Sequence, residues 1–126
     1  MSTQNEVGYI STQRVGETIP QFRRVKLDAS GNWLMADAAD GDLWSGVIQH
    51  DAASGDLATV RLRNTPGTFF VQASDANISR GVAASTGAIY PGDDGTVVGA
   101  TAATRLKLVA LETPASGQIF EVGPVG

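Results

Sequence analysis

The sequence predicts an all-β fold, a small barrel or sandwich of short antiparallel strands with at most one short helix. Three observations support this prediction. Gly or Pro interrupts the chain about every ten residues, and short β-branched or aromatic runs lie between these breaks. Residues 57–63 alternate between apolar and polar side chains, as a strand with one buried face requires. The segments between the runs combine glycine with Asp or Ser, which is typical of tight turns.

Each expected element follows from its local composition. Strands are expected where β-branched and aromatic residues cluster, over residues 22–27, 33–36, 44–49, 57–63, 68–73, 89–90, 96–98, 107–111 and 118–122. Turns are expected where glycine allows a positive φ angle, at residues 28–32, 51–56 and 91–95. The one candidate helix covers residues 74–84, where Asp75 is placed to cap it and Gly81 limits its length.

The length fits one domain, and the first residues differ from the rest. A chain of 126 residues can bury a core without disulfides, and this one has no cysteine. Residues 1–20 carry scattered apolar side chains without a regular period, and Pro20 ends the segment. We therefore expect an N-terminal arm over residues 1–20 and a single β domain over residues 21–126. A leader followed by the first strand is the alternative for the same segment.

The second half of the expected domain repeats the order of elements in the first half. Residues 25–62 and 88–124 each predict strand, turn, strand, linker, strand, turn and strand, and Gly95 is placed like Gly31. Two similar β-meander halves would fit the length. Chance matches between glycine-rich segments are the alternative, so the sequence leaves an internal duplication open.

Composition and charge argue against several functions. Nine Lys and Arg against 13 Asp and Glu give a net charge of −4, which opposes binding to nucleic-acid phosphates. No run approaches the roughly 20 apolar residues of a membrane helix. The first residues lack the basic and apolar parts of a signal peptide. We expect a soluble product made inside a cell, with no nucleic-acid and no membrane partner.

Candidate catalytic and metal-binding residues are few. His50 is the sole histidine and precedes Asp51, but neighbouring strand residues point to opposite faces, so a catalytic triad with Ser45 or Ser54 is not expected. The three carboxylates of residues 37–42 lack the spacing of a calcium-binding loop and predict an acidic turn. We expect no catalytic residue, no cofactor and no metal. The rival hypothesis is a small hydrolase in which His50 acts together with the carboxylate of Asp37, Asp40 or Asp42.

Aromatic and basic residues allow further interpretations. Trp33 and Trp44 are expected in the core or at a subunit interface, and the alternative is a sugar-stacking surface that also uses Tyr90. The basic cluster of residues 23–26 is too small to bind nucleic acid and is expected to flank a strand edge.

The motifs from Val25 onward follow a recognisable order. The series is Leu27-Asp28 before a turn, Trp33-Leu34-Met35-Ala36, residues 37–41, Gly46-Val47-Ile48, residues 59–62 and Gly67-Thr68-Phe69. This series resembles the lambdoid phage head decoration proteins. In the second half, Gly87-Ala88-Ile89-Tyr90 and residues 109–112 before residues 115–117 are similar to a broader group of phage capsid cement proteins.

The resemblance implies a non-enzymatic virion protein that binds the outside of an expanded phage head. Such a protein is made in the host cytoplasm, forms a homotrimer and clamps adjacent subunits of the major capsid protein. The family's arm reaches onto the capsid, and the expected arm contacts in this chain are Val7, Tyr9, Ile10, Val15 and Ile19. Trp33 or Trp44 is expected to anchor a subunit interface. The alternative function is a head-fibre or carbohydrate-binding β module.

Overall fold

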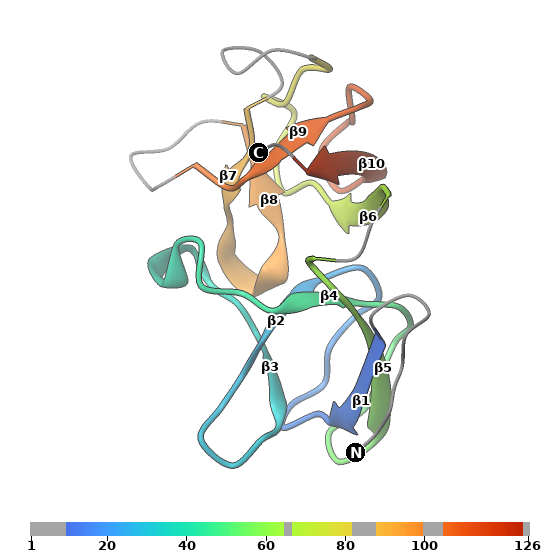
Figure 1. Ribbon diagram of the computed structural model, residues 1–126. Helices are drawn as coiled ribbons and strands as arrows, with labels where there is room; N and C mark the ends of the chain where they lie inside the picture. The colour runs from blue at the N-terminus through green and yellow to red at the C-terminus, as the bar shows by residue number, and fades with distance from the viewer. Residues whose placement is uncertain (1–9, 65–66, 82–87, 100–104, 125–126) are drawn as a thin grey trace.

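The computed structural model describes residues 10–64, 67–81, 88–99 and 105–124 (Figure 1). Ten short strands and two 3₁₀ turns make up its regular structure, so the prediction of an all-β fold is confirmed. The sheets remain open and do not close into a barrel. Within these residues, no helix is long and apolar enough to span a membrane.

The first half of the chain builds a five-stranded antiparallel sheet with the order β1-β5-β4-β2-β3. The strands are β1 (Ile10–Arg14), β2 (Arg24–Leu27), β3 (Trp33–Met35), β4 (Gly46–Ile48) and β5 (Leu57–Leu62). The alternation predicted for β5 is present, because Ala58 and Val60 are fully buried while Thr59 is half-buried. A parallel bridge between Val15 and Trp33 links the chain after β1 to β3.

The second half builds a three-stranded sheet, β6-β10-β9, and a separate hairpin of β7 and β8. The strands are β6 (Phe69–Gln72), β7 (Tyr90–Pro91), β8 (Val97–Val98), β9 (Leu108–Ala110) and β10 (Ile119–Pro124). Isolated bridges from Ala73 to Val97 and from Ala88 to Val109 tie the hairpin to the sheet. In Figure 1 this half lies above the first, and its β7–β8 hairpin reaches down toward β2.

Strand pairs of the first half recur at corresponding places in the second. Leu27–Trp33 corresponds to Pro91–Val97, and Ile48–Val60 corresponds to Ala110–Val122. Arg14–Leu57 corresponds to Gln72–Ile119, and the bridge Val15–Trp33 corresponds to the bridge Ala73–Val97. The bridge between Ala88 and Val109 likewise stands where β2 pairs with β4. Both halves therefore connect their strands in the same order and register.

The helix predicted over residues 74–84 is absent from its described part, residues 74–81. The Asp75 carboxylate accepts hydrogen bonds from the backbone N–H groups of Asn77 and Gly99, so it stabilises a turn and a cross-chain contact in place of a helix cap. The 3₁₀ turns lie elsewhere, at η1 (Ala38–Asp40) and η2 (Asp93–Gly95).

Two hydrophobic clusters form the core. One lies within the first half and contains Val15, Ile19, Val25, Trp33, Ile48, Ala52, Ala58 and Val60. The other lies in the second half and includes Phe69, Val71, Phe120 and Val122 among its members. Ala36, Trp44 and Val47 of the first half belong to this second cluster. Apolar burial therefore continues across the junction between the halves and stabilises their packing.

The structure places residues 10–20 in the β domain and not in an arm, which corrects the expected boundary at residue 20. Ile10–Arg14 pairs along β5, and the side chains of Val15 and Ile19 are 2% and 0% exposed. Ile19 also exchanges two backbone hydrogen bonds with Ala52, of 2.9 and 3.0 Å. Burial of these side chains stabilises the fold, so Val15 and Ile19 are core residues and not capsid contacts. Val7 and Tyr9 lie outside the described residues.

Candidate functional site

A buried arginine connects the two halves. The Arg24 side chain is 0% exposed, and its Nη2 donates to the backbone oxygens of Thr96 at 2.8 Å and Gly92 at 2.9 Å. Burial is the main cause that lowers the pKa of Arg24 to about 10, while Asp40, Asp37 and Asp42 oppose this effect. The prediction that Arg24 flanks a strand edge is wrong, because β2 lies inside the sheet between β4 and β3.

The turns η1 and η2 exchange hydrogen bonds across the same junction. The Asp37 carboxylate accepts from the backbone N–H of Asp94 at 3.0 Å, and the Asp93 carboxylate accepts from that of Ala38 at 3.2 Å. The predicted acidic turns are therefore contacts between the halves. Throughout the described ranges, no group of three or more His, Cys, Asp or Glu side chains is placed to hold a metal ion.

Gly95 sits at the point of closest approach. Its N–H donates to the Ala36 oxygen at 2.7 Å, and its φ angle is +76°. A Cβ atom at this position would lie 2.7 Å from the Arg24 oxygen and 2.8 Å from the Arg23 Cβ. The tip of the β7–β8 hairpin thus packs directly on the backbone of β2, and only glycine fits there without a shift.

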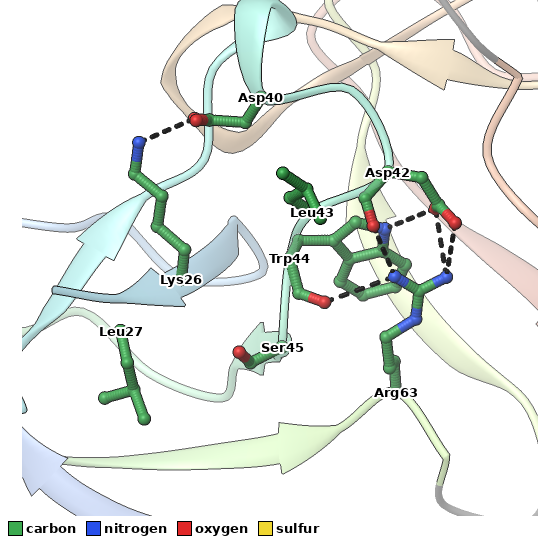
Figure 2. A pocket seen from close by; sticks show the side chains of 8 residues that line it. All are labelled: Lys26, Leu27, Asp40, Asp42, Leu43, Trp44, Ser45 and Arg63. Carbon is green, nitrogen blue, oxygen red and sulfur yellow. Dashed lines mark hydrogen bonds and ion pairs between the residues drawn. The ribbon is translucent and has the colours of Figure 1, made fainter.

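An open depression of about 550 Å³ lies on the first half beside this junction (Figure 2). Its lining residues come from β2, from η1 and the loop after it, and from the position directly after β5. They are Lys26, Leu27, Asp40, Asp42, Leu43, Trp44, Ser45 and Arg63. Four of these side chains are charged, and they form two ion pairs, Lys26–Asp40 and Arg63–Asp42. The depression therefore carries balanced charge.

The first ion pair fixes η1 to β2. Lys26 Nζ lies 2.7 Å from Asp40 Oδ2, and the same carboxylate accepts from the backbone N–H of Asp37 at 2.8 Å. The hydrogen bond from Lys26, followed by that from Asp37, lowers the pKa of Asp40. Because the pair is partly exposed, its contribution to stability is at most about 1 kcal/mol.

The second ion pair holds the loop of residues 42–44. Arg63 Nη2 lies 2.9 and 3.1 Å from the two oxygens of the Asp42 carboxylate, and Nη1 donates to the backbone oxygens of Asp42 and Trp44. The guanidinium carbon also lies 4.3 Å from the centroid of the Trp44 ring, at cation–π distance. Several bonds thus fix a short loop whose middle residue, Leu43, is 77% exposed.

The depression combines charged groups that bond to one another with exposed apolar side chains. Its charged groups are bonded to one another, and exposed Leu43 and Leu27 (47%) lie beside it. Apolar side chains held by a rigid loop lose little conformational entropy on binding, which favours them as contact points. The sequence alone does not predict this site, because residues 37–42 have the pattern of an isolated acidic turn and no local signal links them to Arg63.

Trp33 and Trp44 do not lie at an open surface of this chain. Trp33 is 1% exposed and belongs to the first cluster, while Trp44 is 4% exposed and packs on Phe69 with ring centroids 6.3 Å apart. The expected role of either tryptophan as an anchor for a second subunit is therefore corrected to a core role. The same burial removes the sugar-stacking surface that would have used both rings.

Within the described part of the chain, the bonds of the His50 ring go to backbone groups. Its Nδ1 donates to the backbone oxygen of Asp51 at 3.0 Å, and its Nε2 accepts from the backbone N–H of Thr59 at 3.1 Å. The Asp51 carboxylate accepts from the backbone N–H of Gln21 instead. The carboxylates that the hydrolase hypothesis would use also bond elsewhere: Asp37 accepts from Asp94 N–H, Asp40 from Lys26 and Asp42 from Arg63.

The fold is similar to that of a solved structure, whereas the sequence comparisons find no match. No family model and no curated protein matches the sequence. Among solved structures, the chain is similar to the crystal structure of the N base of head fibre gp8.5 in bacteriophage phi29. The match covers 90% of each chain with a TM-score of 0.71 and 20% sequence identity. At this identity the match shows a shared fold, and the resemblance to the lambdoid decoration family gains no support from it.

Proposed function

We propose that this chain is a non-enzymatic structural protein of a phage virion and attaches to the outside of the head. The observation that carries the proposal is the shared fold, over 90% of both chains, with the base of a phage head fibre. The sequence resemblance to head decoration proteins independently favours the same location. The depression with its exposed leucines supplies a surface suited to a protein partner, for which we propose the major capsid protein.

Within this function, a head-fibre base is the favoured role. The similar structure is itself a fibre base, and the fold leaves no tryptophan surface for a carbohydrate-binding module. A cement role, in which the chain clamps adjacent capsid subunits, is the second candidate, because the order of motifs over residues 25–72 resembles decoration proteins. In both roles a homotrimer would place three weak contacts on the capsid lattice at once and raise the overall affinity.

Sedimentation with phage heads tests the proposal. Purified protein is mixed with expanded and unexpanded heads of the phage that carries its gene, and the pelleted fraction is measured over a concentration series. We expect saturable binding to expanded heads, and binding to neither form would reject head attachment. Light scattering of the free protein should give three times 13.1 kDa, and a strict monomer would reject the preformed trimer.

Two further measurements separate the candidate roles. Heads saturated with the protein are heated, and release of packaged DNA is compared with that from bare heads. A clamp raises the release temperature, whereas a fibre base leaves it unchanged. His50→Ala should bind heads like the wild type, and loss of the biological function in this variant with an intact fold would revive the hydrolase hypothesis.

A further inference from the structure

We infer that the two halves of the chain are copies of one structural unit, and that the tip of the β2–β3 hairpin in the first copy binds a partner protein. The corresponding tip of the second copy, in the β7–β8 hairpin, is docked on the first copy. Besides strand register, buried side chains recur at corresponding positions: Val15 and Ala73, Ile19 and Ile78, Val25 and Ile89, Trp33 and Val97, Ile48 and Ala110, Ala58 and Phe120, and Val60 and Val122. Turn hydrogen bonds recur too, since Gly55 N–H donates to Val15 as Gly117 N–H donates to Ala73.

In the second copy, the tip of the β7–β8 hairpin is covered by the first copy. Pro91 and Gly92 are buried, and Arg24 donates to the oxygens of Gly92 and Thr96. The space around Gly95 is filled, because an added Cβ would meet the backbone of Arg24 within 3 Å. This docked tip therefore shows what such a hairpin requires of its receptor: a cation for its carbonyl oxygens and a close backbone surface.

In the first copy, the corresponding β2–β3 tip is closed by the same outer main-chain bond, and no described residue packs on its glycine. Its turn differs, because Gly31 N–H donates to Asp28 within the tip, whereas Gly95 N–H donates to Ala36 of the other copy. The N–H of Asp28 donates to Asn32 at 2.9 Å, as Gly92 does to Thr96 at the same distance. Gly31 has a φ angle of +85°, yet an added Cβ there would meet nothing within 4 Å. Leu27, which corresponds to buried Pro91, is 47% exposed.

The chemistry of the free tip specifies a basic protein surface. Asp28 stands where Gly92 stands in the docked tip, so the free tip carries a carboxylate at the position whose counterpart is bound by Arg24. That carboxylate is held in place by the N–H groups of Ser30 and Asn32. Exposed Leu27 adds an apolar contact beside it. The matching partner presents an arginine or lysine next to an apolar patch, and this step rests on the proposed function in assigning it to the capsid protein.

A second copy of this chain does not supply that receptor. Arg24 is already bonded to the chain's own β7–β8 tip, and the corresponding position in the second half is Ala88, which carries no charge. The receptor that holds the docked tip is therefore not available in a second copy, which favours a different protein as the source of the cation.

Sedimentation with expanded heads also tests the free tip, using variants that preserve the fold. Leu27→Ser removes the apolar contact, and Asp28→Asn removes the charge while its amide oxygen still accepts from the N–H groups of Ser30 and Asn32. We expect Leu27→Ser to weaken head binding about tenfold or more. Asp28→Asn should weaken it about three- to tenfold at low salt, with a smaller effect at high salt. Leu57→Ser is the matched control, because Leu57 is 56% exposed on β5 of the same half.

The outcomes separate three claims: attachment to the head, docking of the free tip, and the identity of the protein that the tip contacts. If the wild type binds heads and both tip variants bind equally well, the docking of the tip is wrong although head attachment stands. Failure of the wild type to bind rejects both. If Leu27→Ser instead lowers the mass measured by light scattering, the tip contacts a second copy, and the assigned partner is overturned. Urea unfolding of every variant confirms that a lost affinity is not a lost fold.

Discussion

Adding one methyl group at the docked tip should destabilise the protein far more than adding it at the free tip. The two positions are Gly95 and Gly31, which have φ angles of +76° and +85° and therefore carry the same backbone cost for alanine. A left-handed conformation costs a non-glycine residue about 1–2 kcal/mol, partly offset by the reduced freedom of the unfolded chain. For Gly31→Ala this is the whole effect, so we expect a loss of about 1 kcal/mol, because the added Cβ meets nothing within 4 Å.

Gly95→Ala has a second cost. Its Cβ would lie 2.7 and 2.9 Å from backbone atoms of Arg24, so either the hairpin tip or β2 must move. Overpacking of this kind costs about 1–3 kcal/mol, which brings the expected total to roughly 2–4 kcal/mol. Urea unfolding followed by circular dichroism measures both variants on the same scale. Equal losses for the two variants would show that the tip is not tightly docked and would remove the basis for contrasting the two hairpins.

Three further changes test other parts of the fold. Deleting residues 2–18 should abolish cooperative unfolding in circular dichroism, because it removes β1 and Val15, and an unchanged melting curve would contradict the pairing of β1 with β5. Phe120→Ala should cost about 3–5 kcal/mol in urea unfolding, since the side chain is 0% exposed, and a loss below about 1 kcal/mol would show that the site is not close-packed. Because the pKa of Asp40 is lowered from 3.8, its pair with Lys26 should stabilise the fold above pH 3.8 and lose this effect as the pH falls through the lowered value. Asp40→Asn should flatten this part of the curve of stability against pH, and a curve identical to that of the wild type would contradict it.

Most strands could be predicted from the sequence because their signals are local. The alternation in residues 57–62 and the glycine turns at residues 31, 55 and 95 depend only on neighbouring residues, and all three of these glycines have positive φ angles. Strand β1 was missed because Ser11, Thr12 and Gln13 are polar. Its pairing is with β5, about 45 residues away along the chain, and backbone hydrogen bonds require no apolar pattern.

The candidate site could not be predicted from the sequence, because its side chains are brought together by pairing between strands that are far apart along the chain. Arg24 and Arg63 both look like surface charges in the sequence, and only the order of the strands shows that the first is buried and that the second folds a loop around Trp44. His50 and Asp51 were expected to diverge as neighbouring strand residues, but both lie after the end of β4, and their side chains bond to different backbone groups. Local patterns thus predict strands and turns more readily than contacts between distant segments.

The two halves also explain how a repeat can persist in structure while it fades in sequence. Phe69 and Val71 of β6 are buried against the junction, whereas the corresponding residues of β1 are Ser11 and Gln13. The two copies of the unit face different surroundings, so the side chains at corresponding places differ while the backbone register stays the same. Pro91 and Leu27 also occupy corresponding places with different surroundings, since Pro91 is buried and Leu27 is exposed. Unlike Ser11 and Gln13, however, Leu27 is apolar. Because single exposed apolar residues are common on protein surfaces, the exposure of Leu27 gains meaning only from its position, at a tip whose counterpart is buried in the second copy.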